Sequence, residues 1–350
     1  MIPGTFSETY RQDSVIIRTK TQWAIVILSL LILLTFPLFL SGYWLVVLNL
    51  ILTTIVAVMG LHIITGLCGQ LSLGHAAIVA VGAYTTGILV NEFGFSFWAC
   101  LPIAGIAAGV IGVIFGAPSL RIKGFYLAMS TLAAQFILLW LIERPLSDIT
   151  GGSIGMYVAP PTIAGINLGG GGPSFFYLGL FFAVVAILVA KNLQRSRMGR
   201  AWIAIRDNDL AASIMGINIF KYKTLAFFIG CFFAGIAGWL WAANMGSLHP
   251  TMFSLKESIW FLGMVVVGGM GSTAGVVMGV LGIRLIDMAA SYAAASLGMA
   301  FPTMRGQIFS ALAILVFGGT VTAFLVFEPR GMYHWWEMFK RSYRLHPYSY

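Results

Sequence analysis

The chain has 350 residues, of which 59% are hydrophobic and only 9% are charged, and its formal net charge is +9. A water-soluble globular protein carries about 25% charged residues, so this composition excludes that class. The basic residues lie in short gaps between long apolar stretches, where the preference of cytoplasmic loops for Lys and Arg explains them better than nucleic-acid binding does.

Apolar stretches of about 20 residues, long enough to cross about 30 Å of hydrocarbon, recur along the whole chain. They predict an all-α, polytopic transmembrane helical bundle, since the strands of a β-barrel would show short alternating segments. The expected organisation is a cytoplasmic N-terminal segment, 1–22, a transmembrane domain, 23–327, and a cytoplasmic tail, 328–350. We expect about ten spans, near residues 23–40, 44–65, 71–90, 98–117, 124–142, 175–190, 224–243, 257–268, 274–290 and 306–327.

The distribution of Lys and Arg predicts the topology. Basic residues precede the first span, fill the gap at 121–123, gather between Lys191 and Lys223, and return after Phe327. All four regions are therefore expected on the cytoplasmic side, which requires an even number of crossings. Dividing the apolar region 257–290 into two spans at GGMGS (268–272) gives that even number. In this topology the charged residues that lie toward the outer face are Arg284, Asp287 and Arg305.

Two glycine-rich segments, HIITGLCGQLSLGHAA (62–77) and VVVGGMGSTAGVVMG (265–279), interrupt apolar runs in the two halves of the chain. Such paired interruptions are typical of inverted-repeat transporters with broken helices beside their pathway. Tight helix packing is the alternative for glycines spaced as GxxxG, and a hydrogen-bonded structural role is the alternative for His75. The candidate pathway or gate residues are Gly66, Gly69, Gln70, Ser72, Gly74, His75, Gly268, Gly269, Gly271 and Ser272.

A long gap, 143–174, is rich in glycine and proline and falls on the outer side of the predicted topology. It could be a slack linker, but its apolar residues favour a folded cap that docks on the bundle. A partner-facing role for this external loop is as consistent with the sequence as a purely structural one.

The stretch SRMGRAWIAIRDNDLAASIMGIN (196–218) is polar within an apolar chain and predicts two short helices at an angle. Ser196 can cap the first helix, Asp207 or Asn208 can cap the second, and Gly216 can end it in the left-handed conformation. A helix lying on the membrane surface is the alternative, but Asp207 and Asp209 would then face anionic headgroups. We therefore expect a docking element within a cytoplasmic loop, 191–223.

This stretch resembles the cytoplasmic coupling loop of ATP-binding-cassette (ABC) importer permeases of the high-affinity branched-chain amino acid type, the LivM-type family. Residues 199–227 are similar to that loop, with Asp at 207 and 209 where the family usually has Glu. Further resemblance lies in GLCGQLSLGHAAIVAVGAYTTGIL (66–89), RIKGFYLAMSTLA (121–133), TGGSIGM (150–156) and VVVGGMGSTAGVVMG (265–279), in the family's order.

The resemblance implies one subunit of a permease heterodimer in the bacterial cytoplasmic (inner) membrane, with two cytoplasmic ATPases and an extracytoplasmic solute-binding protein as partners. ATP and Mg²⁺ would bind the ATPases, because this chain has no GxxxxGK[ST] phosphate loop and needs no cofactor of its own. Contact with the binding protein falls on Thr150, Gly151, Gly152 and Gly155. The ATPase-coupling residues are Gly199, Arg200, Arg206, Asp207, Asp209, Ala211, Ala212 and Gly216.

Branched-chain or similar hydrophobic amino acids are the implied substrates, and related permeases for urea, short amides or aromatic acids fit the same residues. A channel or secondary transporter without an ATPase is a further alternative, against which the coupling stretch argues. The chain is not expected to be an enzyme, because Ser153 in GGSIG (151–155) has no histidine placed by sequence as its base. No catalytic residue and no metal site are predicted.

Overall fold

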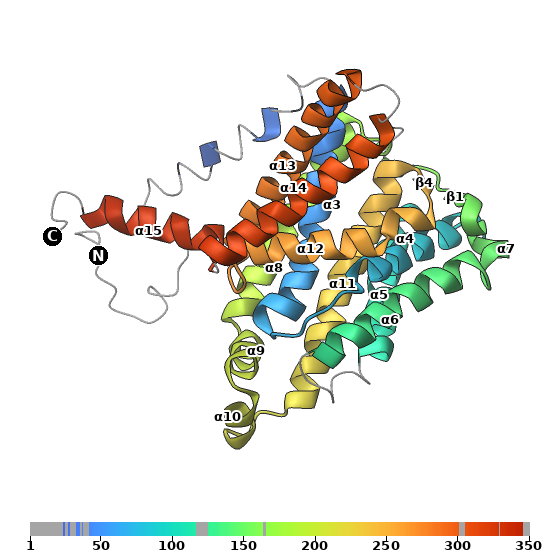
Figure 1. Cartoon of the computed structure of the whole chain (residues 1–350). Coiled ribbons are helices and arrows are strands. Elements are labelled where there is room, and N and C mark those ends of the chain that lie inside the picture. Colours follow the sequence, from blue (N-terminus) through green and yellow to red (C-terminus); the bar gives the residue numbers. More distant parts are fainter. Residues whose placement is uncertain are drawn as a thin grey trace.

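The computed structural model describes residues 42–116, 125–163, 166–300, 305–328 and 330–345, with isolated positions between 24 and 37. The predicted N-terminal segment, 1–22, and most of the first predicted span, 23–40, lie outside the described residues. The described part is a helical bundle (Figure 1), and the predicted all-α polytopic class is confirmed. The inverted repeat stays a prediction.

Nine of the ten predicted spans coincide with helices, and most boundaries agree to within a few residues. These helices are α3 (Gly42–Leu61), α4 (His75–Asn91), α5 (Phe97–Gly116), α6 (Phe125–Glu143), α8 (Pro173–Arg195), α11 (Ile219–Met245), α12 (Leu255–Gly268), α13 (Thr273–Ala300) and α14 (Arg305–Phe327). Within the described residues, seven helices are long and apolar enough to cross a membrane, or eight if α14 and the following α15 (Met332–Leu345) form one bent span.

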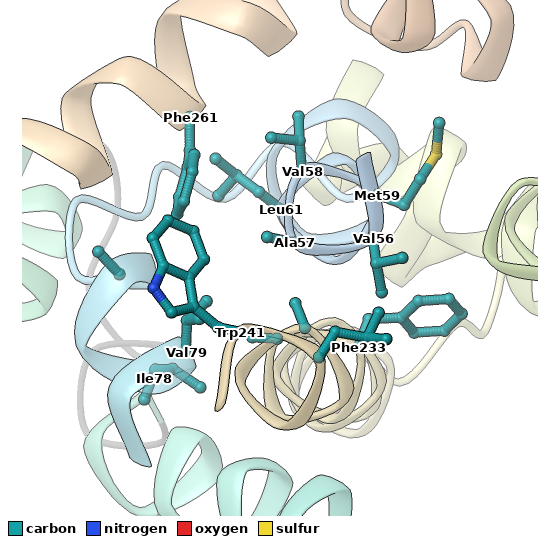
Figure 2. Close-up of a cluster of buried hydrophobic side chains, with 14 of the residues drawn as sticks. Val56, Ala57, Val58, Met59, Leu61, Ile78, Val79, Phe233, Trp241 and Phe261 are labelled. Atoms are coloured by element: carbon teal, nitrogen blue, oxygen red, sulfur yellow. The ribbon is translucent and has the colours of Figure 1, made fainter. Parts of the chain in front are cut away.

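The core lies around α11, which packs against α3, α4 and α5. Figure 2 shows Val56 of α3 facing Phe233 of α11, while Trp241 of α11 extends toward Phe261 of α12. The membrane-spanning part of α11 is apolar on all sides because other helices surround it.

Glycines of α5 allow close packing against α11. A Cβ added at Gly105 would lie 2.7 Å from the Phe232 ring, and one at Gly109 would lie 2.9 Å from the Phe228 ring. Both distances are shorter than a normal carbon–carbon contact, so only glycine fits at this helix separation. The packing interpretation of these GxxxG glycines is therefore confirmed.

The predicted external loop is a folded cap, not a slack linker. It contains α7 (Ser147–Thr150), a 3₁₀ turn (Gly152–Ile154) and three short strands, β1 (Met156–Tyr157), β2 (Thr162–Ile163) and β3 (Ile166–Asn167). β2 and β3 form an antiparallel pair. β1 pairs antiparallel with β4 (Ser247–Leu248), which follows α11 and precedes another 3₁₀ turn (Pro250–Phe253). The β1–β4 pair docks the cap on the bundle.

The predicted docking element lies at the opposite end of the bundle from the cap (Figure 1). α8 runs from the cap to this element, which consists of α9 (Arg197–Asp207) and α10 (Asp209–Ile214), and α11 runs back to β4. The predicted split of 257–290 is confirmed, since α12 ends at Gly268 and α13 begins at Thr273.

Candidate gate and coupling site

The polar stretch folds as two capped helices. The Ser196 hydroxyl accepts a hydrogen bond from the Gly199 amide at 3.2 Å, and the Asn208 side chain accepts one from the Ala211 amide at 3.0 Å. Gly216 follows α10 with φ +83°, the left-handed conformation that ends a helix without strain only at glycine or asparagine. The predicted caps and the predicted stop are confirmed, and Asn208 rather than Asp207 caps the second helix.

One face of α9 anchors the element to the bundle. Trp202 is fully buried, and its indole Nε1 donates a 2.8 Å hydrogen bond to the Tyr222 carbonyl at the start of α11. Gly199 is also buried, because its Cα lies against the Leu193 and Gln194 carbonyls of α8. A displacement of α9 would therefore be transmitted to both α8 and α11.

The second helix of the element is exposed and apolar. Leu210, Ile214 and Met215 are 67%, 78% and 81% exposed at the tip of the molecule. Ala211 is exposed beside them, whereas Ala212 is buried. An exposed apolar cluster beyond the membrane-spanning helices is typical of a protein–protein contact.

Arg206 connects the element to both glycine-rich breaks. Its Nη1 donates a 2.9 Å hydrogen bond to the Gly66 carbonyl of the first break. A Cβ added at Gly271 of the second break would lie 2.8 Å from the same Nη1. The guanidinium is held by Asp207, whose Oδ1 lies 3.0 Å from both Nε and Nη2. Three segments that are distant in the sequence therefore meet at one arginine.

The first break begins where α3 changes into a π-helix, η1 (His62–Leu67). The chain leaves it through Gly69, whose φ is +71°, and the Thr65 hydroxyl donates a 3.0 Å hydrogen bond to the Gln70 carbonyl. Residues 68–74 are not helical, and Gln70 and Ser72 are nevertheless buried. Such π-helical segments frequently mark functional sites.

The chain returns from this break into the interior of the bundle, where α4 begins. The first amide groups of α4 point at polar side chains of other helices: Ala76 N donates to Ser258 Oγ at 2.9 Å, and Ala77 N donates to Gln135 Oε1 at 3.0 Å. Gln135 also donates to the Phe253 carbonyl at 2.6 Å. The sequence analysis missed Gln135 and Ser258, because a single buried Gln or Ser inside an apolar span has no distinguishing pattern.

The second break is a tight turn between α12 and α13. Gly269 and Gly271 have φ of +110° and +95°, and the Ser272 hydroxyl caps α13 by accepting from the Gly275 amide at 3.2 Å. Gly268 is buried against the backbone of α13. Gln194 at the end of α8 donates a 2.7 Å hydrogen bond to the Gly271 carbonyl, a contact that sequence analysis also missed.

His75, at the end of the first break, has a structural contact. His75 Nε2 lies 2.8 Å from the Ala57 carbonyl of α3, and its ring packs edge-on against Phe261. Gly74 precedes it with its Cα against the Thr131 carbonyl of α6, where no larger side chain fits. This geometry favours the structural alternative for His75.

An ion pair lies inside the bundle. Arg284 of α13 is 8% exposed; its Nη2 lies 3.7 Å from Glu257 Oε2 of α12 and donates a 3.1 Å hydrogen bond to the Thr54 hydroxyl of α3. The predicted location of Arg284 toward the outer face stays a prediction. Its side chain points into the interior of the bundle, where Glu257 and Thr54 are its partners. Ionisable side chains within membrane helices usually face the bundle interior.

The four predicted docking residues of the cap form one compact turn. Gly151, Gly152 and Gly155 have positive φ, and the Thr150 hydroxyl donates to the Ile142 carbonyl at 2.7 Å. This turn presents Ile154, which is 85% exposed. The Ser153 hydroxyl beside it donates to Glu143 Oε1 at 2.7 Å.

A cavity of about 380 Å³ lies between the first break and the docking element. Its lining includes Gln70, Arg206, Asp209 and Lys223. Lys223 is only 4% exposed, so the cavity contains a sheltered positive charge beside acidic side chains. Of the predicted gate residues Gly69 and Gln70 line this cavity, and of the predicted coupling residues Arg206, Asp207 and Asp209 do. The other predicted gate and coupling residues lie outside its lining, and the predicted docking residues of the cap lie at the other end of the molecule.

Residues 43–318 match the family described as branched-chain amino acid transport system / permease component. The chain belongs to this family. It is similar to the high-affinity branched-chain amino acid transport system permease protein LivM of Escherichia coli K12, with 33% identity over 298 residues, 78% of this chain and 66% of that protein. It therefore spans slightly less than two thirds of the length of that relative.

More distant relatives differ in the solute that their names give. A probable branched-chain amino acid transport permease protein LivM of Methanocaldococcus jannaschii is 28% identical over 66% of each chain. The galactose/methyl galactoside import permease protein MglC of Haemophilus influenzae is 26% identical over 55% of this chain and 60% of that protein. No solved structure matches the chain. Family membership and the apolar helices make the protein a multi-pass membrane permease.

Proposed function

We propose that the chain is the transmembrane permease subunit of an ABC importer that translocates branched-chain or similar hydrophobic amino acids. It would act in the bacterial inner membrane with its N- and C-termini in the cytoplasm. Its partners would be a second related permease subunit, two cytoplasmic ATPases that hold ATP and Mg²⁺, and an extracytoplasmic solute-binding protein. The ATPases would dock on residues 196–217, and the binding protein on the turn at 150–155.

The contact of Arg206 with both breaks is the observation that carries this proposal. A push on the exposed tip of α10 moves α9, and α9 is bonded to the Gly66 carbonyl by Arg206 and to α11 by Trp202. The second break follows because Gly271 packs against the same guanidinium and its carbonyl accepts from Gln194 of α8. A rigid element with these contacts can shift both breaks together, as alternation between outward-open and inward-open states requires. Arg200, which donates to the Arg195 carbonyl at 2.8 Å, lies on the exposed side and is proposed to contact the ATPase directly.

The substrate class follows from the relatives and from the apolar interior. Small and apolar residues dominate the helices beside the breaks, which suits a hydrophobic solute selected beforehand by a binding protein. Urea, short amides and aromatic acids are the alternative solutes of a permease with the same architecture. An ATPase-independent channel or secondary transporter is the alternative mechanism.

The test is solute-stimulated ATP hydrolysis by the complete complex in proteoliposomes. Leucine, isoleucine and valine, each with the binding protein, should raise both ATP hydrolysis and uptake, whereas urea and aromatic acids should raise neither. Stimulation by urea or an aromatic acid alone would change the substrate assignment. Full-rate uptake without nucleotide would overturn the ABC mechanism.

A further inference from the structure

The tail helix α15 lies outside the segment that matches the permease family, which ends at residue 318. It extends away from the helical bundle (Figure 1) and bends by 49° from α14. Its start lies at the same end of the molecule as α9, because Gly331 packs against Gly269 of the second break, whose Gly271 touches Arg206. The structure therefore puts the tail on the coupling-loop side.

The sequence of α15 is strongly amphipathic. Apolar residues recur at 332, 335, 336, 339 and 343, the spacing of one continuous helical face. The rest of the helix contains Lys340, Arg341 and Arg344 with a single acidic residue, Glu337. This combination of aromatic residues on one face and basic residues elsewhere is typical of helices that lie in a membrane interface.

Only the first turn of the apolar face is used within the chain. Met332 packs against α13 beside Gly282, and the Trp335 ring lies 6.4 Å from that of Phe324. Trp336 and Phe339, which stack on each other at 6.2 Å, are 49% and 66% exposed. The apolar face therefore continues beyond the protein with no partner among the described residues.

The exposed surface next to this face belongs to a membrane helix. Val326 and Phe327 at the end of α14 are 68% and 82% exposed, as expected of side chains that face lipid. α15 begins shortly after α14 ends, and its Trp335 contacts Phe324 of α14, so the exposed Trp336 and Phe339 follow the end of this span. The occupant that fits an exposed aromatic face just after a membrane helix, with basic residues beside it, is the membrane–water interface.

We infer that α15 binds the cytoplasmic surface of the bilayer, with Trp336 and Phe339 at the boundary of the acyl chains and its basic residues near anionic phospholipid headgroups. The helix is also joined to the second break, because Gly331 packs against Gly269 and the Cβ of Tyr333 lies beside Gly269 and Gly275. The second break thus lies between the coupling element and a helix held by lipid.

The depth of α15 can be measured on the full-length chain in nanodiscs of phosphatidylcholine with phosphatidylglycerol. An environment-sensitive fluorophore is attached at Phe339→Cys or, on the opposite side of the helix by its 3.6-residue repeat, at Arg341→Cys. The native cysteines are buried and leave the labelling selective. We expect nitroxide groups near the headgroup end of the acyl chains to quench position 339, and aqueous iodide to quench position 341.

Equal quenching of both positions by iodide would show a tail free in water, and shielding of position 339 from both quenchers would show a protein partner instead. Either result would overturn the inference. The attraction of the basic residues to anionic headgroups is tested in the same discs. Each basic residue near an anionic surface raises the affinity of a helix for the membrane roughly fivefold. Replacing phosphatidylglycerol by phosphatidylcholine, or raising the salt concentration, should reduce lipid quenching at 339.

A matched pair of triple variants separates charge from helix formation. Lys340→Gln with Arg341→Gln and Arg344→Gln should abolish the increase in quenching at 339 that phosphatidylglycerol causes. Glu at the same three positions should reverse it, so that phosphatidylglycerol lowers the quenching. Identical quenching in both lipids for the unaltered tail would contradict the role of anionic headgroups. Because the lipid and salt measurements need no charge-reversed variant, failure of that variant to fold leaves the test intact.

Discussion

Arg206 is the residue on which the proposed coupling depends most directly. Arg206→Ala removes a charge-assisted hydrogen bond to the Gly66 carbonyl, and bonds of this kind contribute about 1.5–3 kcal/mol. We expect ATP-dependent uptake to fall roughly 10-fold or more, while ATP hydrolysis by the complex falls less. The ratio of solute transported to ATP hydrolysed is the measurement, because a merely destabilised permease would lose both activities together.

Arg206→Lys and Arg197→Ala are the comparisons for this variant. Lys keeps the charge but has a single ammonium, which cannot contact both Gly66 and Asp207 as the guanidinium does, so we expect partial rescue. Arg197, on the exposed side of the same helix, should tolerate Ala with uptake close to the unaltered level. A normal transport ratio in Arg206→Ala would show that the breaks move without this bond.

The glycines of the second break are the other residues at which a substitution should have a strong effect. Gly271→Ala places a Cβ 2.8 Å from Arg206 Nη1, at a φ of +95° that an L-residue rarely adopts. We expect a loss of at least about 1 kcal/mol in stability, measured as a lower melting temperature of the purified complex. Gly318→Ala is the control, since the space around Gly318 in α14 is open and Ala favours a helix. An unchanged melting temperature for Gly271→Ala would mean that the turn can rearrange.

Sequence reasoning was most successful for single residues with a local role. Ser196, Asn208 and Gly216 were recognised because a cap or a left-handed stop depends on a few neighbouring residues. The contact between Arg206 and Gly66 could not be recognised in this way. It depends on which side of α9 faces the bundle and on how α3 ends, and both are set by packing between segments separated by 140 positions.

At the scale of elements, the start of α4 inside the bundle is the least expected feature. The sequence predicted a span near 71–90 and an interruption within 62–77, and the helix begins at His75. Residues 68–74 are not helical. The helix can begin inside the bundle because the first amide groups of α4 donate hydrogen bonds to the side chains of Gln135 and Ser258. An apolar run shows that a segment is buried, but it does not show where within the membrane a helix begins.

Gln135→Leu tests this arrangement, because it removes the acceptor of the Ala77 amide and the donor to the Phe253 carbonyl. Each buried polar group left without a partner costs about 1–3 kcal/mol, so we expect a clearly lower melting temperature. Ser296→Ala serves as the control, since that exposed hydroxyl donates to the Ala293 carbonyl of its own helix. Equal melting temperatures for the two variants would show that water or a rearranged side chain replaces Gln135.

At the scale of the whole molecule, the two predicted partner surfaces lie at opposite ends of the bundle, and α8 and α11 connect them. This separation follows from the order of the segments, because each span reverses the direction of the chain. The order of the basic and glycine-rich segments between the spans was therefore sufficient to predict that the two surfaces lie at opposite ends. The meeting of the two breaks was not predictable in this way, since it requires the three-dimensional packing of α12 and α13 beside η1.

The orientation of the bundle in the membrane gives the last prediction. Ser213→Cys lies on the exposed α10, and Ile154→Cys lies on the cap, at a side chain that is 85% exposed. Because basic residues around α9 favour the cytoplasmic side, a membrane-impermeant maleimide added to intact spheroplasts should label position 154 and leave position 213 unlabelled. Inside-out vesicles should give the opposite pattern, and the unaltered chain, whose three cysteines are buried, should stay unlabelled in both. Labelling of position 213 from outside would invert the topology and would place α10 beyond the reach of a cytoplasmic ATPase.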